Sequence, residues 1–299
     1  MIKNGLTVRF TEVGKIKIGG KGESRKSKDG KDYQLPIRYE HFVVTTTEKG
    51  KDGNFVPDME LMKKLGPEPK EIKIRLLFDS IDMNFWTSFQ MYAGKKCVCR
   101  GDGVDAVRWT KEGAEQHIKC NPHECEFLQS EKCKVSGILS CHIPESMEAG
   151  GVYRFRTHSW YSVSGILAAL QYISENTNGV LQGLPLKLKF LKKSTQDHGN
   201  VNIVTVVLDG VEMMKMRELA KLEYENRMQL GISMKQIEDQ ARAIGFMDDK
   251  DDPEDVETEF YPPVVEAKPE PGASAEDVKE KLENKDTKPE PKNEQGALL

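Results

Sequence analysis

The chain has no apolar run that approaches 18 residues, so the sequence predicts no membrane-spanning helix. Residues 1–5 lack the apolar core of a secretory signal, and we expect a cytoplasmic protein whose thiols stay reduced. Catalytic signatures are missing as well. The sequence contains no HExxH, no HxE followed by PCxxC, and no GxxxxGK[ST] or GxGxxG loop. These absences favour a protein that is not an enzyme.

Acidic charge is concentrated at the C-terminal end. Residues 248–299 hold 17 acidic and 7 basic side chains, together with 7 of the 14 prolines. The other 247 residues carry 37 basic and 31 acidic groups, so a mildly basic body precedes an acidic tail. Because charge and proline leave too little apolar surface to offset the entropy of ordering, we expect the tail to be disordered.

Periodicity predicts an α+β fold with mixed or antiparallel sheets. Strand-like runs are expected at 6–10, 41–47 and 71–78, and a basic loop is expected over 19–32 between the first two. Asp58 is placed to cap a short helix that ends at Leu65. Five segments follow from these patterns. They are an N-terminal α+β unit (1–95), a cysteine-rich segment (96–145), a β-α-β-β unit (146–210), a helical hairpin (211–246) and the acidic tail (247–299).

Two helix boundaries are marked within the later segments. In the β-α-β-β unit, Ser162 or Ser164 is the expected N-cap, and the last two strands are expected to pair as a hairpin. In the helical hairpin, Gly231 separates the helices, and Ser233 with Gln236 forms a capping box for the second.

All six cysteines lie between positions 97 and 141, and this clustering is the strongest chemical signal in the sequence. Reduced cysteines gathered in a polar, turn-rich segment are typical of a structural Zn²⁺ site with four thiolate ligands. We expect the ligands to be Cys99, Cys120, Cys125 and Cys133. Cys97, Cys141 and three histidines (His117, His123 and His142) remain alternatives, and buried thiols without a metal are the simpler reading.

A second candidate is a surface that combines cations with aromatic rings, which could contact nucleic acid or a protein partner. It comprises Arg154, Arg156, Trp160, Tyr161, Lys187, Lys189, Lys192 and Lys193. The alternative is a solvated face whose lysines protect an edge strand from pairing with other chains.

Several segments together resemble one protein family. They are Gly14-Lys-Ile-Lys-Ile-Gly19, the 40–47 strand, Cys99-Arg-Gly-Asp-Gly103, the Cys120/Cys125/Cys133 set, Gly137-Ile-Leu139 and Tyr153-Arg-Phe-Arg-Thr-His-Ser159. Over residues 1–210 the chain is similar to the recombination directionality factor-like proteins of phages and prophages. The 211–245 helices and the acidic tail extend beyond this resemblance.

The resemblance implies a function and a host. Such a factor binds its large serine integrase and switches it from integration to excision in the bacterial cytoplasm, acting on DNA directly or through the integrase complex. The cysteines carry over as expected zinc ligands, and no catalytic residue carries over. Two other functions stay open: a single-stranded DNA-binding or annealing protein that uses the lysine strand, and a zinc-dependent hydrolase or nuclease.

Overall fold

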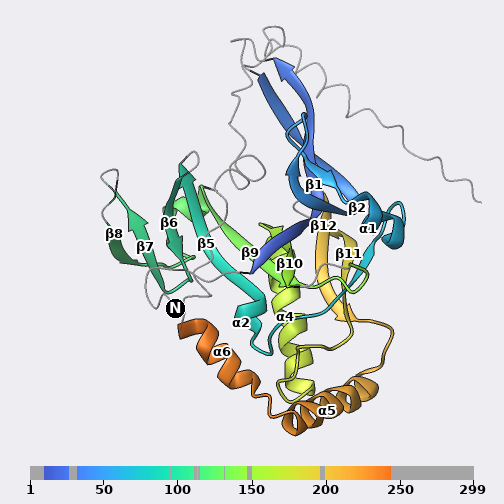
Figure 1. Cartoon of the computed structure of the whole chain (residues 1–299). Helices are drawn as coiled ribbons and strands as arrows, with labels where there is room; N and C mark the ends of the chain where they lie inside the picture. Colours follow the sequence, from blue (N-terminus) through green and yellow to red (C-terminus); the bar gives the residue numbers. More distant parts are fainter. Residues whose placement is uncertain are drawn as a thin grey trace, which may run out of the picture. The chain divides into compact units, whose positions relative to one another are not determined.

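The structure is a computed structural model that describes residues 10–26, 32–93, 96–110, 113, 115–130, 132–146, 150–195 and 199–243. The whole predicted tail (247–299) therefore lies outside the described residues, as does the end of the predicted helical hairpin (244–246). The described part is mixed α+β, which confirms the predicted class (Figure 1). Within it, no helix is both long and apolar enough to cross a membrane.

A nine-stranded sheet with the order β3-β2-β1-β10-β9-β5-β6-β7-β8 dominates the fold. Its one parallel pair is β1 with β10, and the other neighbours are antiparallel. The strands are β1 (Thr11–Lys26), β2 (Asp32–Lys49), β3 (Phe55–Pro57), β5 (Phe85–Ala93), β6 (Lys96–Gly101), β7 (Asp105–Trp109), β8 (Glu115–Lys119), β9 (Cys133–Cys141) and β10 (Gly151–Thr157).

A second sheet has three antiparallel strands in the order β12-β11-β4, namely β12 (Gly199–Leu208), β11 (Leu186–Thr195) and β4 (Glu71–Ile74). The hairpin of β11 and β12 was predicted, whereas the pairing of β4 with β11 joins segments far apart in the chain. The helices are α1 (Met59–Leu65), α2 (Ile81–Asn84), α3 (Glu126–Gln129), α4 (Trp160–Asn176), α5 (Met213–Gln229) and α6 (Met234–Ala243).

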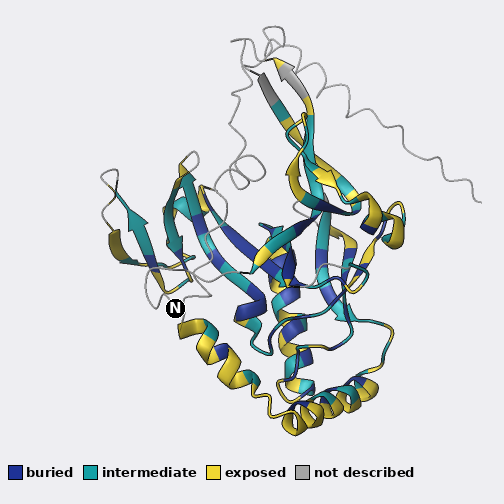
Figure 2. Cartoon of the chain, viewed as in Figure 1, coloured by how far each residue is buried: buried dark blue, intermediate teal, exposed yellow. Residues whose placement is uncertain are grey.

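One hydrophobic core joins both sheets and the long helix α4. Phe42, Phe155 and Phe190 meet edge to face in it, with ring centres 6.2 to 6.4 Å apart. Buried residues concentrate where the sheets and α4 meet, while α5 and α6 are largely exposed (Figure 2). Helix α4 also covers the free edge of β12, because the Val204 amide donates to Ser162 Oγ at 3.0 Å.

Local signals account for several elements. The Asp58 carboxylate accepts from the Leu61 amide at 3.0 Å, and α1 ends at Gly66, as predicted. The Gln236 amide donates to Ser233 Oγ at 3.3 Å, which confirms half of the predicted capping box. Gly231 has a φ of +68° between α5 and α6, the left-handed conformation that glycine adopts without strain.

Two local expectations were wrong. The basic run over 19–32 is not a loop throughout, because β1 continues to Lys26 and pairs with β2, which begins at Asp32. Cross-strand hydrogen bonds thus override a composition typical of loops. The N-cap of α4 is Ser159, whose hydroxyl accepts from the Ser162 amide at 3.3 Å, so the helix begins earlier than the apolar spacing indicated.

Candidate metal centre and cationic surfaces

The four cysteines predicted as zinc ligands line one small cavity on the core side of the large sheet. Cys99 comes from β6, Cys133 from the start of β9, and Cys120 and Cys125 from the loop between β8 and α3. The cavity measures about 20 Å³, which is room for a single water-sized atom and too small for an organic ligand. Four thiols from two strands and one loop therefore line a space of ionic size.

The backbone around this cavity is closely fitted. The Cys120 amide donates to the Val104 carbonyl at 2.8 Å, and the Cys125 amide closes a turn onto Asn121 at 2.9 Å. A Cβ at Gly101 would lie 2.7 Å from Cys120 Sγ and 2.9 Å from Ala106 Cβ. Glycine at position 101 is thus what allows the loop thiol to approach β6.

Cationic side chains also border the cavity. Arg108 and Lys119 line it, and the Arg108 guanidinium lies 4.9 Å from the centre of the Phe127 ring. Burial, and after it the charges of the neighbouring thiols with Cys125 first, raises the pKa of the Cys133 thiol to about 12. Burial also raises the pKa of Cys120, although a hydrogen bond from the Gly103 amide acts in the opposite direction.

The other candidate ligands lie elsewhere. Cys141 is fully buried in the hydrophobic core, with Sγ 3.8 Å from the Tyr153 carbonyl oxygen. In a regular strand Cys97 and Cys99 would share a face, but a register shift in the pairing of β5 with β6 places Cys99 opposite Met91 and Cys97 opposite Tyr92. Neither Cys97 nor any of the three histidines lines the cavity.

Cys99, Cys120, Cys125 and Cys133 line the same cavity, but their side chains do not adopt the geometry of a metal coordination sphere. Among the described residues, no group of three or more His, Cys, Asp or Glu side chains is arranged to hold a metal ion. The donor set nevertheless fits Zn²⁺, because four thiolates, a cavity of single-atom size and adjacent cations suit a tetrahedral site with sulfur ligands at about 2.3 Å. Filling the site would require the four side chains to close around the ion.

The predicted cationic and aromatic surface does not form one open patch. On β10, Arg156 pairs with the Glu12 carboxylate at 2.6 Å, and Arg154 contacts it at 3.4 Å. Their side chains are only 9% and 11% exposed. These two arginines are therefore part of a largely buried ion cluster that the sequence did not reveal, since Glu12 lies more than 140 residues away.

The lysine strand is engaged by acidic neighbours. Lys187 and Lys189 both pair with Glu71 on β4, at 2.6 and 2.9 Å. Lys192 pairs with Glu40 at 2.5 Å. The Lys193 ammonium lies 5.2 Å from the centre of the Tyr161 ring. Acidic side chains thus offset much of the positive charge expected along β11.

The two aromatic residues at the start of α4 are the most accessible members of the predicted surface. Trp160 is 51% exposed and Tyr161 is 40% exposed. Trp160 also packs against Phe89 of β5, with ring centres 5.5 Å apart. Trp160 thus lies beside the large sheet, while Tyr161 contacts Lys193 of β11.

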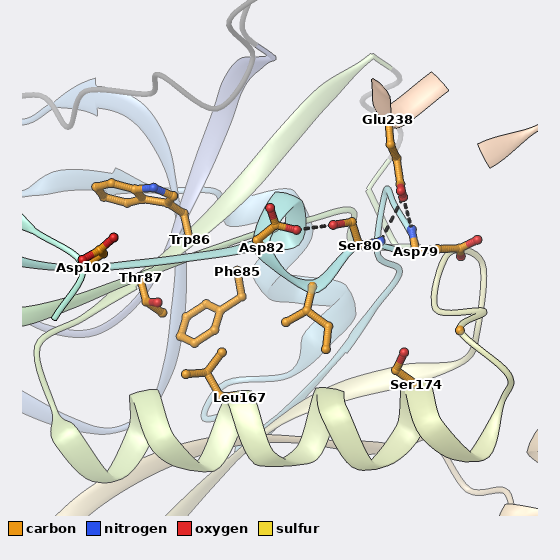
Figure 3. A pocket seen from close by; sticks show the side chains of 12 residues that line it. Asp79, Ser80, Asp82, Phe85, Trp86, Thr87, Asp102, Leu167, Ser174 and Glu238 are labelled. Carbon is orange, nitrogen blue, oxygen red and sulfur yellow. Dashed lines mark hydrogen bonds between the residues drawn. The ribbon is translucent and has the colours of Figure 1, made fainter. Parts of the chain in front are cut away.

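A second, open pocket of about 960 Å³ lies where α6 meets the loop before α2. In Figure 3, Glu238 of α6 points into this loop, and its carboxylate accepts from the Asp79 and Ser80 amides at 2.8 and 2.9 Å. Arg227 of α5 donates to Asp79 Oδ2 at 2.7 Å and to the Gln182 carbonyl at 2.9 Å. The contacts of Glu238 and Arg227 with the loop before α2 attach α5 and α6 to the body of the protein.

Comparison with protein families places the chain in one of them. A family model described as Gp3-like, recombination directionality factor-like, matches residues 13–212. The matched residues run from within β1 to the residue before α5. They include the cysteine cavity and the cations Lys15, Arg154 and Arg156, whereas Glu12 lies one residue before the match. No curated protein sequence matches the chain.

Proposed function

The chain belongs to the Gp3-like, recombination directionality factor-like family, and from that premise we propose that it binds a serine integrase and biases it toward excision. The family match carries this proposal, because it spans two thirds of the chain and names directionality as the shared property. The protein acts without catalysis of its own. The integrase performs the strand exchange, and the accessory factor changes which arrangement of the integrase–DNA complex is favoured.

The physical basis is differential binding. A factor that contacts the excision-competent arrangement more tightly than the integration-competent one shifts the equilibrium between them. A difference of about 5.5 kcal/mol moves a two-state preference from 1:99 to 99:1, so contacts by a few well-placed residues are sufficient. Trp160 and Tyr161, half exposed at the start of α4, are suitable anchors for such an interface.

A binding measurement tests the first step. The purified full-length protein is mixed with the serine integrase encoded in the same genome and analysed by sedimentation velocity, with and without attachment-site DNA. We expect a complex without DNA, weakened by Trp160→Ala. Tyr172→Ala is the matched control, because Tyr172 is 58% exposed farther along α4. Failure to detect a complex at any tested concentration, with or without DNA, would contradict integrase binding.

We further propose that Cys99, Cys120, Cys125 and Cys133 hold a structural Zn²⁺ ion. The convergence of these four thiols on a cavity of about 20 Å³ supports this assignment. Bound zinc would tie β6, β9 and the loop before α3 together and contribute directly to folding. The set contains sulfur ligands alone, which suits a structural role better than a catalytic one with an open coordination position.

Metal content measured after purification tests the zinc proposal. We expect one zinc per chain, lost in Cys120→Ser and Cys125→Ser and retained in the control Cys97→Ser, which lies outside the cavity. Because ligand variants can fail to fold, Co²⁺ substitution of the unmutated chain gives an independent readout. Intense thiolate-to-cobalt absorption supports four sulfur ligands, whereas zinc-free folded protein would refute the assignment.

The alternative functions receive less support from the described contacts. A single-stranded DNA-binding role through β11 requires accessible lysines, but Lys187 and Lys189 are paired with Glu71. A hydrolase or nuclease requires a metal with an open position, whereas the described lining of the cavity contains four cysteines and no histidine or carboxylate. Zinc-dependent hydrolysis of DNA by the purified protein would reverse this preference.

A further inference from the structure

Exposed apolar side chains are concentrated in the helical pair of α5 and α6. Sixteen large apolar side chains are exposed in the part of the chain that the structure describes, and seven of them lie between residues 214 and 237. They are Met214, Leu222, Tyr224, Met228, Leu230, Ile232 and Ile237. Single exposed apolar residues are common on any protein, but such a concentration is typical of an interaction surface.

Helix α5 has a buried side and an exposed stripe. The buried side holds Met216, Ala220 and Arg227. Five residues on another side, at positions 214, 217, 221, 224 and 228, are all exposed, in keeping with the exposed colour along much of α5 in Figure 2. Their spacing alternates between three and four residues, which is the spacing of a coiled-coil seam. We call this set the exposed stripe: Met214, Arg217, Lys221, Tyr224 and Met228.

The two cations of the exposed stripe are positioned by neighbours in their own chain. The Arg217 guanidinium lies 3.8 Å from Met214 Sδ and also donates to the Asn176 amide oxygen of α4. The Lys221 ammonium lies 3.8 Å from the Glu225 carboxylate, one turn along the helix. The Lys221 side chain nevertheless stays 77% exposed. Both cations are therefore fixed on the helix surface and remain accessible to a partner.

The order of residues along the exposed stripe determines how it can contact a copy of itself. The cations Arg217 and Lys221 come first, and the apolar Tyr224 and Met228 follow. In a parallel pair of α5 helices, each cation would face the same cation of the other copy, which is unfavourable. In an antiparallel pair, the cations of one copy face the tyrosine and methionine of the other. The stripe is thus complementary to itself in the antiparallel arrangement alone.

We propose that two copies of the chain associate through their exposed stripes, with the two α5 helices antiparallel. Lys221 of each copy lies opposite Tyr224 of the other, where the ammonium contacts the face of the ring. Arg217 lies opposite Met228, whose flexible side chain packs along the stem of the arginine. Glu225 follows Tyr224 directly and places a carboxylate beside Lys221 of the other copy. Because the contact is two-fold symmetric, each of these pairs occurs twice.

The same alignment brings the turn after α5 into the contact. When Lys221 is opposite Tyr224, Met214 of one copy comes level with Gly231 of the other. Gly231 has no side chain and leaves room for the methionine, and its neighbours Leu230 and Ile232 are 74% and 39% exposed. The interface therefore includes five of the seven exposed apolar residues of the helical pair. Helix α5 has 17 residues and is about 25 Å long, which accommodates all of these contacts.

This self-association goes beyond the proposed function and does not depend on it. Helices α5 and α6 follow the residues matched by the family model, and the contact needs no integrase and no DNA. It can therefore be measured on the purified chain alone. Failure of the integrase experiments would leave the result unchanged, and the reverse is also true.

Sedimentation equilibrium of the full-length protein tests the proposal. We expect a concentration-dependent equilibrium between one and two chains. Tyr224→Lys places a lysine opposite Lys221 twice per dimer, so the dissociation constant of the dimer should rise roughly tenfold or more. Tyr224→Glu places a carboxylate opposite the same lysine and should retain the dimer. Tyr172→Lys on α4, where the tyrosine is 58% exposed, is the matched control and should also retain it.

A compensating variant isolates the predicted pair. Lys221→Glu combined with Tyr224→Lys places opposite charges across the interface again, so we expect the double variant to regain the dimer that Tyr224→Lys loses. Because Lys221 and Tyr224 are both exposed, each variant should keep the thermal unfolding curve of the unmodified chain, as recorded by circular dichroism.

Three outcomes would overturn the proposal. The unmodified chain could remain a monomer at every concentration. Tyr224→Lys and Tyr224→Glu could weaken the dimer equally, which would show that position 224 does not face Lys221 of another copy. The chain alone could be monomeric while Tyr224→Lys weakens the complex with the integrase, in which case the exposed stripe contacts the integrase and not a second copy.

Discussion

Glu12 illustrates how one residue can organise a charged cluster. Its carboxylate contacts Lys15, Arg154 and Arg156 within a largely buried environment. Burial alone would raise the pKa of Glu12, but the hydrogen bond and charge of Arg156, together with Lys15, lower it from 4.5 to about 2. The ionised form is therefore the one that stabilises the folded protein.

The pH dependence of unfolding tests this role of Glu12. Since its folded pKa lies below its ordinary value, its contribution is complete above about pH 4.5 and is lost as the pH falls toward 2. We expect Glu12→Gln to lower the free energy of unfolding at pH 7 by up to about 3 kcal/mol, with the difference narrowing below pH 4.5. Urea unfolding across this range provides the measurement.

Glu71→Gln is the matched control for Glu12. The Glu71 side chain also contacts two lysines, but it is 38% exposed, so its loss should cost less than about 1 kcal/mol. A Glu12 variant that unfolds like the unmodified chain at pH 7 would show that the cluster does not stabilise the fold.

Gly101 is the second residue whose role can be isolated. A Cβ there would meet Cys120 Sγ at 2.7 Å, so Gly101→Ala should destabilise the protein by about 1–3 kcal/mol and weaken zinc retention. Gly165→Ala on α4 is the control. A Cβ at position 165 would meet the Thr205 side chain at an ordinary 3.7 Å, so this substitution should leave stability unchanged or raise it. Thermal unfolding with parallel zinc analysis distinguishes the two. An unaffected Gly101 variant would contradict the close packing of this loop.

At the scale of elements, the helical pair depends on polar contacts more than on burial. Helix α5 buries Met216 and Ala220, but its attachment centres on Arg227, whose side chain is 7% exposed and pairs with Asp79 and Glu223. Because α5 and α6 follow the family match, these contacts join an extension beyond the matched residues to the matched body.

Removing the buried arginine tests that attachment. We expect Arg227→Leu to lower the free energy of unfolding by about 3–5 kcal/mol, because Asp79 loses its buried counter-charge, and to speed amide hydrogen exchange in α5 and α6. Lys235→Ala on α6 removes an exposed pair with Asp239 and should change stability by less than about 0.5 kcal/mol. Equal exchange in both variants would show that the ion pair does not hold the helices.

Elements with local signals were predictable, and those set by distant pairing were not. The cap at Asp58 and the hairpin of β11 and β12 each depend on residues close in sequence. By contrast, the parallel pairing of β1 with β10 joins segments more than 130 residues apart. No periodicity in either segment specifies its neighbour in the sheet.

The candidate sites show the same difference between residues close in sequence and residues brought together by distant strand pairing. Clustering in sequence was enough to select the four cysteines that share a cavity, because metal ligands are often drawn from one short segment. The ion cluster at Glu12 was missed, although Glu12 and Lys15 lie close together in the sequence. Its other members, Arg154 and Arg156, come from β10, and only the sheet order brings them next to β1.

For the whole molecule, the predicted segments are not separate structural layers. Strands from the N-terminal unit, the cysteine-rich segment and the β-α-β-β unit all contribute to the nine-stranded sheet. A metal at the cysteine cavity would therefore stabilise one end of a sheet whose centre carries the ion cluster at Glu12. Integrase contact and zinc binding can each be measured on the same full-length chain.

A recombination assay tests the central claim most directly. The serine integrase from the same genome is supplied with attL × attR or attP × attB substrates, and the full-length protein is added in increasing amounts. We predict that excision between attL and attR rises while integration between attP and attB falls. An active integrase whose two reactions are both unchanged by the protein would contradict a directionality role.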